Sequence, residues 1–184
     1  MAEARKTYPI EIGGVKRDLR LFEVKPGLKI AILNILGDTE LVQASARELA
    51  KKLAGQPFDV LVSAESKSIP LIHALSVETG KPYVILRKSY KIYMGEAIEA
   101  ETLSITTGKP QKLILDEKDI PLLKGSRAAI VDDVISTGST LDGMRHILKK
   151  AGAEVTVEAA IFTEGDPGEW QHILALGHLP VFTD

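Results

Sequence analysis

Short apolar segments alternate with helical patterns through the middle and the end of this chain. Strands are predicted at residues 58–63, 83–86, 127–131 and 155–162, with helices at residues 70–79 and 141–151. A glycine follows each of these two helices, as is common where a helix ends. Nearly continuous apolar strands joined by helices indicate a parallel sheet covered on both faces, with right-handed crossovers. The predicted fold class is α/β, with a parallel central sheet flanked by helices.

Other segments complete this prediction. Residues 7–12 and 16–24 partly alternate apolar and polar side chains around Gly13-Gly14, which predicts an N-terminal hairpin. Residues 39–53 have apolar side chains at helical spacing, and a last helix is expected to begin near Trp170. Residues 88–124 carry only weak strand patterns, which we interpret as a flexible loop with a small ribbon. A length of 184 residues suits a single domain, residues 1–184.

The charge and composition of the chain limit its partners. A formal net charge of -2 argues against nucleic-acid binding, which needs a surplus of Lys and Arg. No segment approaches the roughly 20 apolar residues of a membrane span, and the N-terminus lacks the apolar core of a signal peptide. The absence of cysteine excludes thiolate nucleophiles and cysteine-based zinc sites. We therefore expect a cytoplasmic protein with no nucleic-acid partner and no membrane partner.

Polar loops follow three of the predicted strands. Ligands of parallel α/β sheets gather beyond the carboxyl ends of the strands. The loops after Ser63, Leu86 and Val131 are therefore expected to face one common cleft.

Two carboxylates and a hydroxyl-rich loop follow Val131. Asp132 and Asp133 can accept hydrogen bonds from sugar hydroxyls and can hold hydrated Mg²⁺ directly or through water. The next segment suits a phosphate, because backbone amides, hydroxyls and the start of a helix converge there; it contains Ser136, Thr137, Gly138, Ser139 and Thr140. The acids alone would fit a turn, and the loop alone would fit a helix cap. Together they favour a site that holds a sugar and a phosphate side by side.

The stretch from Val131 to Thr140 resembles the 5-phosphoribosyl-1-pyrophosphate (PRPP) signature of the type I phosphoribosyltransferases. Within that family the chain is most similar to adenine phosphoribosyltransferases, through Val24-Lys-Pro-Gly-Leu28, Arg87-Lys88 and the order of elements. The resemblance implies the type I fold, Mg²⁺, and a homodimer that places a basic residue in the neighbouring subunit's site. It also implies that Asp132 and Asp133 hold the ribose hydroxyls and that residues 136–140 hold the 5-phosphate. The expected catalytic residues are Asp132, Asp133 and Arg87.

The loop after residues 58–63 lies where this family binds pyrophosphate through backbone amides. It contains Glu65, Ser66, Lys67 and Ser68. Adenine enzymes usually have Arg and Gly where this chain has Lys67 and Ser68. A serine could adopt the required backbone, but a serine in a conformation natural for glycine would be strained. The alternative is an ordinary turn from strand to helix with a solvated lysine.

Further positive charge follows the strand at residues 83–86. Arg87, Lys88 and Lys91 would stabilise the charge that grows on the leaving pyrophosphate, and closure of their loop would exclude water. The alternatives are a solvated loop or a basic and aromatic nucleic-acid patch.

A purine is the expected acceptor, with adenine ahead of xanthine, guanine or hypoxanthine. Two departures weaken the adenine assignment. The glutamate usual in adenine enzymes is missing from the stretch Ser104-Ile-Thr-Thr-Gly108. The Phe-Arg-Asp sequence that the family usually carries after the early Pro-Gly is also absent, because other residues stand at positions 30–34. Glu96, Glu99 or Glu101 could substitute for the glutamate, or could be solvated. A non-catalytic PRPP-binding sensor or regulator is the alternative function.

Overall fold

A computed structural model describes residues 6–103 and 110–183 of the chain. Its central sheet contains five parallel strands in the spatial order β10-β9-β8-β4-β5. These strands are β4 (Val60–Ala64), β5 (Tyr83–Leu86), β8 (Arg127–Ile135), β9 (Glu154–Glu164) and β10 (Leu174–Leu179). The predicted parallel sheet is therefore confirmed.

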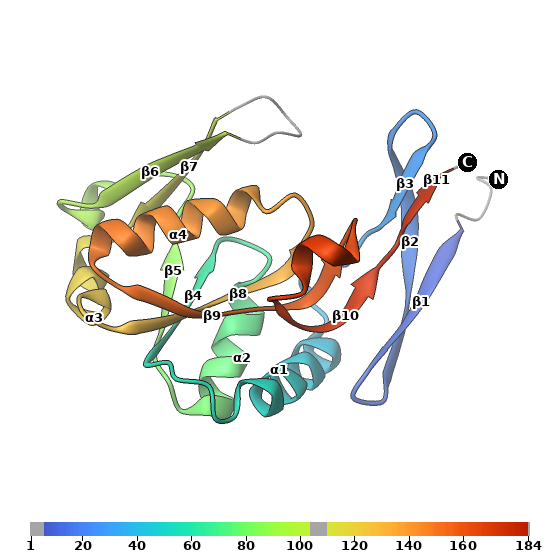
Figure 1. Cartoon of the computed structure of the whole chain (residues 1–184), viewed down its shortest axis with the longest axis horizontal. Coiled ribbons are helices and arrows are strands. Elements are labelled where there is room, and N and C mark those ends of the chain that lie inside the picture. Colours follow the sequence, from blue (N-terminus) through green and yellow to red (C-terminus); the bar gives the residue numbers. More distant parts are fainter. Residues whose placement is uncertain (1–5, 104–109, 184) are drawn as a thin grey trace.

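Helices cover both faces of this sheet (Figure 1). The helices α1 (Thr39–Leu53) and α2 (Ile69–Thr79) pack on one face, and α4 (Ser139–Ala151) packs on the other. Gly80 and Gly152 end α2 and α4 in the left-handed conformation, as the sequence predicts. Each face buries its own cluster of aliphatic side chains, so the strands are apolar on both sides.

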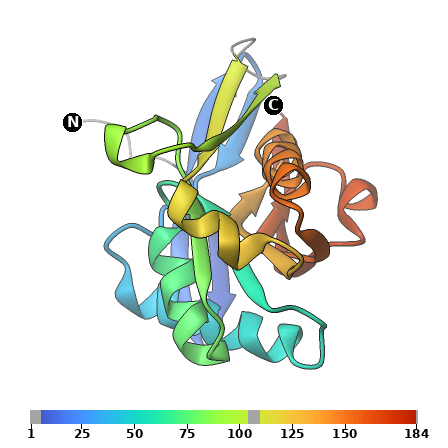
Figure 2. The ribbon, with the colours of Figure 1, turned by 90° about the vertical axis from the view of Figure 1, so that its left-hand side faces the viewer.

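Two smaller sheets flank the central one. The predicted hairpin forms β1 (Thr7–Ile12) and β2 (Val15–Lys25), and β3 (Leu28–Ala31) and β11 (Val181–Thr183) extend it in the order β1-β2-β3-β11. The ribbon β6 (Ile98–Leu103) and β7 (Pro110–Leu115) packs against α4, and the short α3 (Ile120–Leu123) follows it. Figure 2 shows this ribbon and α2 at opposite ends of the molecule.

Two expectations from the sequence are wrong. No helix begins at Trp170, because a 3-10 turn (Pro167–Trp170) leads directly into β10. Strand β8 does not end at Val131 but continues to Ile135, since β9 supplies partners for its last residues. Asp132 and Asp133 therefore belong to the strand itself. Among the described residues, no helix is both long and apolar enough to cross a membrane.

Candidate active site

The acidic pair lies at the carboxyl end of β8, against the loop that follows β4. The Ser68 hydroxyl donates a hydrogen bond of 2.8 Å to Asp132 Oδ1. The backbone N–H of Asp133 donates to the same carboxylate oxygen at 2.9 Å. Lys67 Nζ lies 2.9 Å from Asp133 Oδ2 in an ion pair, and it donates a hydrogen bond of 3.0 Å to the carbonyl of Leu33. The predicted neighbourhood of these two loops is confirmed.

The two carboxylates interact unfavourably with each other. Burial, and then the charge of Asp133, raise the pKa of Asp132 to about 7, although the Ser68 hydrogen bond opposes the shift. Asp133 is only 7% exposed. Hydroxyl donors or a cation would relieve this repulsion, so the pair is suited to a ligand that supplies them.

We expect Asp132→Asn to stabilise the free protein at pH 8. Because the pKa of Asp132 is raised in the folded state, ionisation costs stability progressively from about pH 4 to about pH 7. Above that window the variant should gain about 1 to 2 kcal/mol, less than the full shift would give, because the carboxyl is partly exposed. Urea denaturation at pH 8 and pH 4 measures the difference. Equal stability of variant and native protein at both pH values would contradict the predicted repulsion.

The loop between β8 and α4 forms a small anion cradle. Gly138 has φ +74°, which glycine adopts freely, and α4 begins at the next residue with no side-chain cap on its N-terminus. A cavity of about 60 Å³ lies in this loop, lined by Asp132 and by residues 134–141. Free backbone amides at a helix N-terminus favour a phosphate group. The predicted residues 136–140 are thus gathered around one small cavity.

Trp170 supports this loop from the side. A Cβ atom at position 138 would lie 2.9 Å from Trp170 Cη2, so only glycine leaves room for the indole ring. The Trp170 indole N–H donates a hydrogen bond of 3.0 Å to the carbonyl of Glu164 at the end of β9. The sequence did not assign this role to Trp170, because the ring and the glycine are far apart along the chain.

A second cavity of about 340 Å³ adjoins the first. It is lined by residues 64–68, Lys88, residues 132–134 and Thr140. Both cavities share Asp132, Val134 and Thr140, so they meet at the acidic pair. The loops after β4, β5 and β8 therefore face one cleft, as expected.

In the loop that lines the second cavity, Ser68 has backbone angles that any residue can adopt. Ser68 has φ −81° and ψ −4°, in the right-handed helical region. Ser68 is therefore free of the strain that a glycine-like conformation would impose, since the position does not require glycine. The peptide bond between Glu65 and Ser66 is cis.

Glu65 holds the basic segment that follows β5. Arg87 Nε donates a hydrogen bond of 2.6 Å to one carboxylate oxygen of Glu65, and the backbone N–H of Lys88 donates to the other at 2.5 Å. Burial opposes the effect, but these two donors hold the pKa of Glu65 below its usual value. Arg87 is thus partly neutralised, while Lys88 is exposed and lines the second cavity.

Several predicted residues lie elsewhere. Lys91 is exposed in the turn before Ile92–Met94 and lines neither of these two cavities. Glu99 forms an ion pair with Lys112, and Glu96 and Glu101 are not among the residues that line the two cavities. The Ser104–Gly108 stretch, where a glutamate was sought, lies outside the described residues.

The acidic pair suits a Mg²⁺ ion that is shared with the substrate. Within the described part of the chain, no group of three or more acids, histidines or cysteines is placed to hold a metal. Mg²⁺ commonly uses one or two carboxylates together with substrate phosphates and water. Asp132 and Asp133 fit that arrangement, since both line the cavity that would take the charged substrate.

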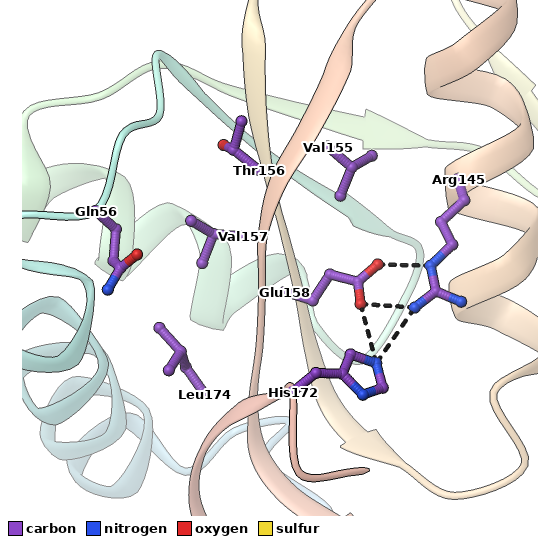
Figure 3. A pocket seen from close by; sticks show the side chains of 8 residues that line it. All are labelled: Gln56, Arg145, Val155, Thr156, Val157, Glu158, His172 and Leu174. Carbon is purple, nitrogen blue, oxygen red and sulfur yellow. Dashed lines mark hydrogen bonds and ion pairs between the residues drawn. The ribbon is translucent and has the colours of Figure 1, made fainter. Parts of the chain in front are cut away.

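A third cavity, of about 500 Å³, lies on the far flank of β9 (Figure 3). Strand β10 pairs with β9 only from Ala159 onward, so this cavity lies at the amino-terminal half of β9. Its one arginine, Arg145, already makes two hydrogen bonds of 2.6 Å to Glu158 and one of 2.9 Å to Asp142. The charge of Arg145 is therefore neutralised, and the cavity lies away from the carboxyl ends of the strands. For both reasons this cavity does not suit a phosphate.

We expect Glu158→Gln to lower the free energy of unfolding by about 2 kcal/mol and to leave ligand binding intact. The Glu158 side chain is only 10% exposed, and the substitution removes the charge that pairs with Arg145. Because the Arg145 side chain is 39% exposed, water can solvate its charge and limits the loss of stability. Urea denaturation and PRPP titration test the two halves of this prediction. A loss of PRPP affinity with unchanged stability would mean that this cavity belongs to the binding site.

A further acid that the sequence did not single out lies near the site, although it lines neither of the two cavities. Glu164 ends β9 at the same sheet edge and is only 7% exposed. The rule that drew attention to Asp132, an acid at the carboxyl end of an apolar strand, also applies to Glu164. The predicted strand at residues 155–162 stopped two residues before it.

Comparison with known proteins identifies relatives over most of the chain. A model of the phosphoribosyl transferase domain matches residues 33–173. The hypoxanthine/guanine phosphoribosyltransferase of Methanotorris igneus is 35% identical over 127 residues, which are 69% of this chain and 66% of that protein. The purine biosynthesis transcriptional repressor PurR of Bacillus subtilis is 28% identical over 158 residues, 83% of this chain and 55% of that protein. The chain thus spans about two thirds and about half of these relatives.

A solved structure supports the fold. The crystal structure of adenine phosphoribosyltransferase from Thermoanaerobacter pseudethanolicus matches with a TM-score of 0.73 at 23% identity, covering 87% of this chain and 95% of that one. At this level of identity the likeness shows the fold, and it confirms the predicted type I architecture.

Proposed function

Because the chain belongs to the phosphoribosyl transferase family, we propose that it transfers a phosphoribosyl group from PRPP to a purine base, releasing pyrophosphate and forming a nucleoside monophosphate. The observation that carries this proposal is the meeting of the two cavities at Asp132. The first cavity would take a phosphate, the second is lined by Lys67 and Lys88, and the acidic pair lies where the two meet. This order matches the 5-phosphate, ribose and pyrophosphate of PRPP.

The proposed reaction needs positioning rather than a covalent nucleophile. The backbone amides of residues 137–141 would hold the 5-phosphate, and Asp132 and Asp133 would accept hydrogen bonds from the ribose hydroxyls. The bond between the anomeric carbon and the pyrophosphate oxygen breaks, a base nitrogen bonds to that carbon, and the nitrogen's proton is released. An oxocarbenium-like transition state resembles that of glycoside hydrolysis.

Positive charge around the second cavity would stabilise the leaving group. Lys67 and Lys88 line that cavity, and Glu65 fixes Arg87 beside it. Mg²⁺, bound with the substrate, would neutralise further charge on pyrophosphate. Closure of the segment after β5 over this cavity stays a prediction.

The choice of base within the purines is a separate proposal. The sequence resemblance favours adenine, whereas the M. igneus relative is named for hypoxanthine and guanine. The adenine enzyme structure, at 23% identity, supports the fold and not the base.

We also propose a cytoplasmic homodimer with no nucleic-acid or membrane partner. Three exposed side chains next to the basic segment support a contact between subunits, because large apolar side chains gathered on a surface often mark an interface; they are Tyr90, Ile92 and Tyr93.

Pyrophosphate release tests the enzymatic proposal. The protein is incubated with PRPP, Mg²⁺ and, in turn, adenine, hypoxanthine, guanine and xanthine. Turnover with at least one base is expected. If PRPP binds but no base is consumed, the enzymatic proposal is wrong, and the alternative of a PRPP-binding sensor, favoured by the likeness to the repressor PurR, stands instead.

A further inference from the structure

An aromatic ring packs against the loop between β8 and α4, which is proposed to hold the 5-phosphate. Trp170 does not line the small cavity of this loop, but it contacts the loop at Gly138. The three atoms nearest to a Cβ at position 138, at 2.9, 3.5 and 3.9 Å, all belong to the six-membered ring of the indole. Since α4 begins at Ser139 with no side-chain cap, this ring is in position to limit movement of the loop backbone.

The segment after β9 holds the indole ring in place. The indole N–H donates a hydrogen bond of 3.0 Å to the carbonyl of Glu164. Asp166 caps the 3-10 turn that carries Trp170, because its side chain accepts a hydrogen bond of 2.8 Å from the N–H of Gly168. After the turn, the N–H of Ile173 donates to the carbonyl of Trp170 at 3.0 Å, and the Ile173 side chain is buried. The ring is therefore fixed by contacts before and after it in the chain.

A group of charged residues ties the same segment to α4 (Figure 3). The rings of His172 and Trp170 are 6.3 Å apart. His172 Nε2 lies 3.4 Å from Glu158 Oε2 on β9 and 3.4 Å from Arg145 Nη2 on α4. Arg145 also donates a hydrogen bond to Asp142, in the first turn of α4. The segment that carries Trp170 is thus attached both to β9 and to the helix whose first turn follows the phosphate loop.

We propose that Trp170 is a positioning residue for the 5-phosphate. Its ring holds the backbone at Gly138, so that the amides of the loop converge on one point before the phosphate arrives. Amides that are already ordered lose less conformational freedom on binding, which raises the affinity. The inference deepens the proposed function, since it rests on the phosphate site at residues 136–140.

The emission of Trp170 tests this inference on the native protein. The chain has a single tryptophan, so its fluorescence comes from this ring alone. Indole emission depends on the surroundings of the ring, and the ring contacts the loop that would bind the phosphate. We expect ribose 5-phosphate to change the emission in a saturable manner, with the dissociation constant that calorimetry gives. Unchanged emission at saturating ribose 5-phosphate would overturn the inference, and this measurement needs no variant to fold.

Replacing Trp170 by leucine should weaken the binding of ribose 5-phosphate by about 10- to 30-fold, because leucine is too short to reach Gly138 and the ligand must then order the loop. The matched control is Phe58→Leu, which removes another core-packed aromatic ring, just before β4 and outside both cavities. Phe58→Leu should lower stability in urea and leave the affinity unchanged. Native affinity in Trp170→Leu, or an equal loss of affinity in both variants, would overturn the inference.

A double-mutant cycle with Gly138→Ala separates positioning from general destabilisation. In the native background the added Cβ meets the ring, and the expected loss of ribose 5-phosphate affinity is about 30- to 100-fold. In the Trp170→Leu background the ring is absent, so the same substitution should cost only about 3- to 10-fold, through its positive φ. Equal factors in the two backgrounds would mean that ring and loop act independently, which contradicts the proposed positioning.

The outcomes separate this inference from the proposed function. If the cycle shows coupling but no base is turned over, the enzymatic proposal fails and the role of Trp170 stands. If nucleotides are formed and Trp170→Leu binds ribose 5-phosphate as the native protein does, the inference alone fails. A native protein that does not bind ribose 5-phosphate would overturn both the phosphate site and the inference.

Discussion

Replacing Asp132 and Asp133 together by asparagine should weaken PRPP binding by about 100-fold or more. Each carboxylate is proposed to accept a hydrogen bond from a ribose hydroxyl, and a hydrogen bond to a charged group contributes about 1.5 to 3 kcal/mol. Asparagine keeps the size of each side chain, and its amide group offers a weaker acceptor. Titration calorimetry with PRPP and Mg²⁺ measures the loss of affinity.

The double variant should remain folded. The buried charge and the repulsion that raise the pKa of Asp132 are absent from it, which offsets the loss of the ion pair between Lys67 and Asp133. Urea denaturation of the double variant shows whether it is folded under the conditions of the titration. The matched control is Asp18→Asn, since Asp18 is an exposed residue of β2 outside both cavities of the site. If the double variant binds PRPP with native affinity, the assignment of the acidic pair to the ribose is wrong.

Replacing Gly138 by alanine should weaken the binding of ribose 5-phosphate by about 30- to 100-fold. The added Cβ would lie 2.9 Å from Trp170 Cη2, and the backbone would keep a φ of +74°, which costs a non-glycine residue about 1 kcal/mol or more. The loop must shift to relieve both effects, and the amides that face the phosphate shift with it. Calorimetry with ribose 5-phosphate and urea denaturation separate the loss of affinity from the loss of stability.

Gly80 provides the control for backbone strain. It ends α2 with φ +65°, and a Cβ there would meet nothing within 4 Å. Gly80→Ala should therefore cost stability of a similar order through its backbone while leaving ribose 5-phosphate affinity unchanged. Native phosphate affinity in Gly138→Ala would contradict the role of the loop. Equal losses of affinity in both variants would indicate general destabilisation.

Much of the fold follows from local patterns in the chain. The apolar period of residues 39–53 predicts α1 with the observed bounds, and the glycines after residues 79 and 151 mark the ends of α2 and α4. The short strands β3, β10 and β11 were missed, because each is only partly buried and shows little of the alternation or continuous apolarity that marks a strand. Their strand conformation comes from pairing with other strands: β10 pairs with β9, and β3 pairs with β11, which is distant in sequence, as well as with β2.

Some features of the site also follow from local sequence, whereas others depend on contacts between distant segments. The sequence by itself determined the acidic pair and the phosphate loop, because residues 131–140 are contiguous and the chemistry of a strand, two acids and a glycine turn is local. Only the tertiary structure decided that Lys67 pairs with Asp133, that Glu65 neutralises Arg87 and that Trp170 requires glycine at position 138. It also decided that Glu164 lies largely buried at the end of β9. Charge pairing and burial depend on which distant segments the sheet brings together, and no local period in the chain encodes those contacts.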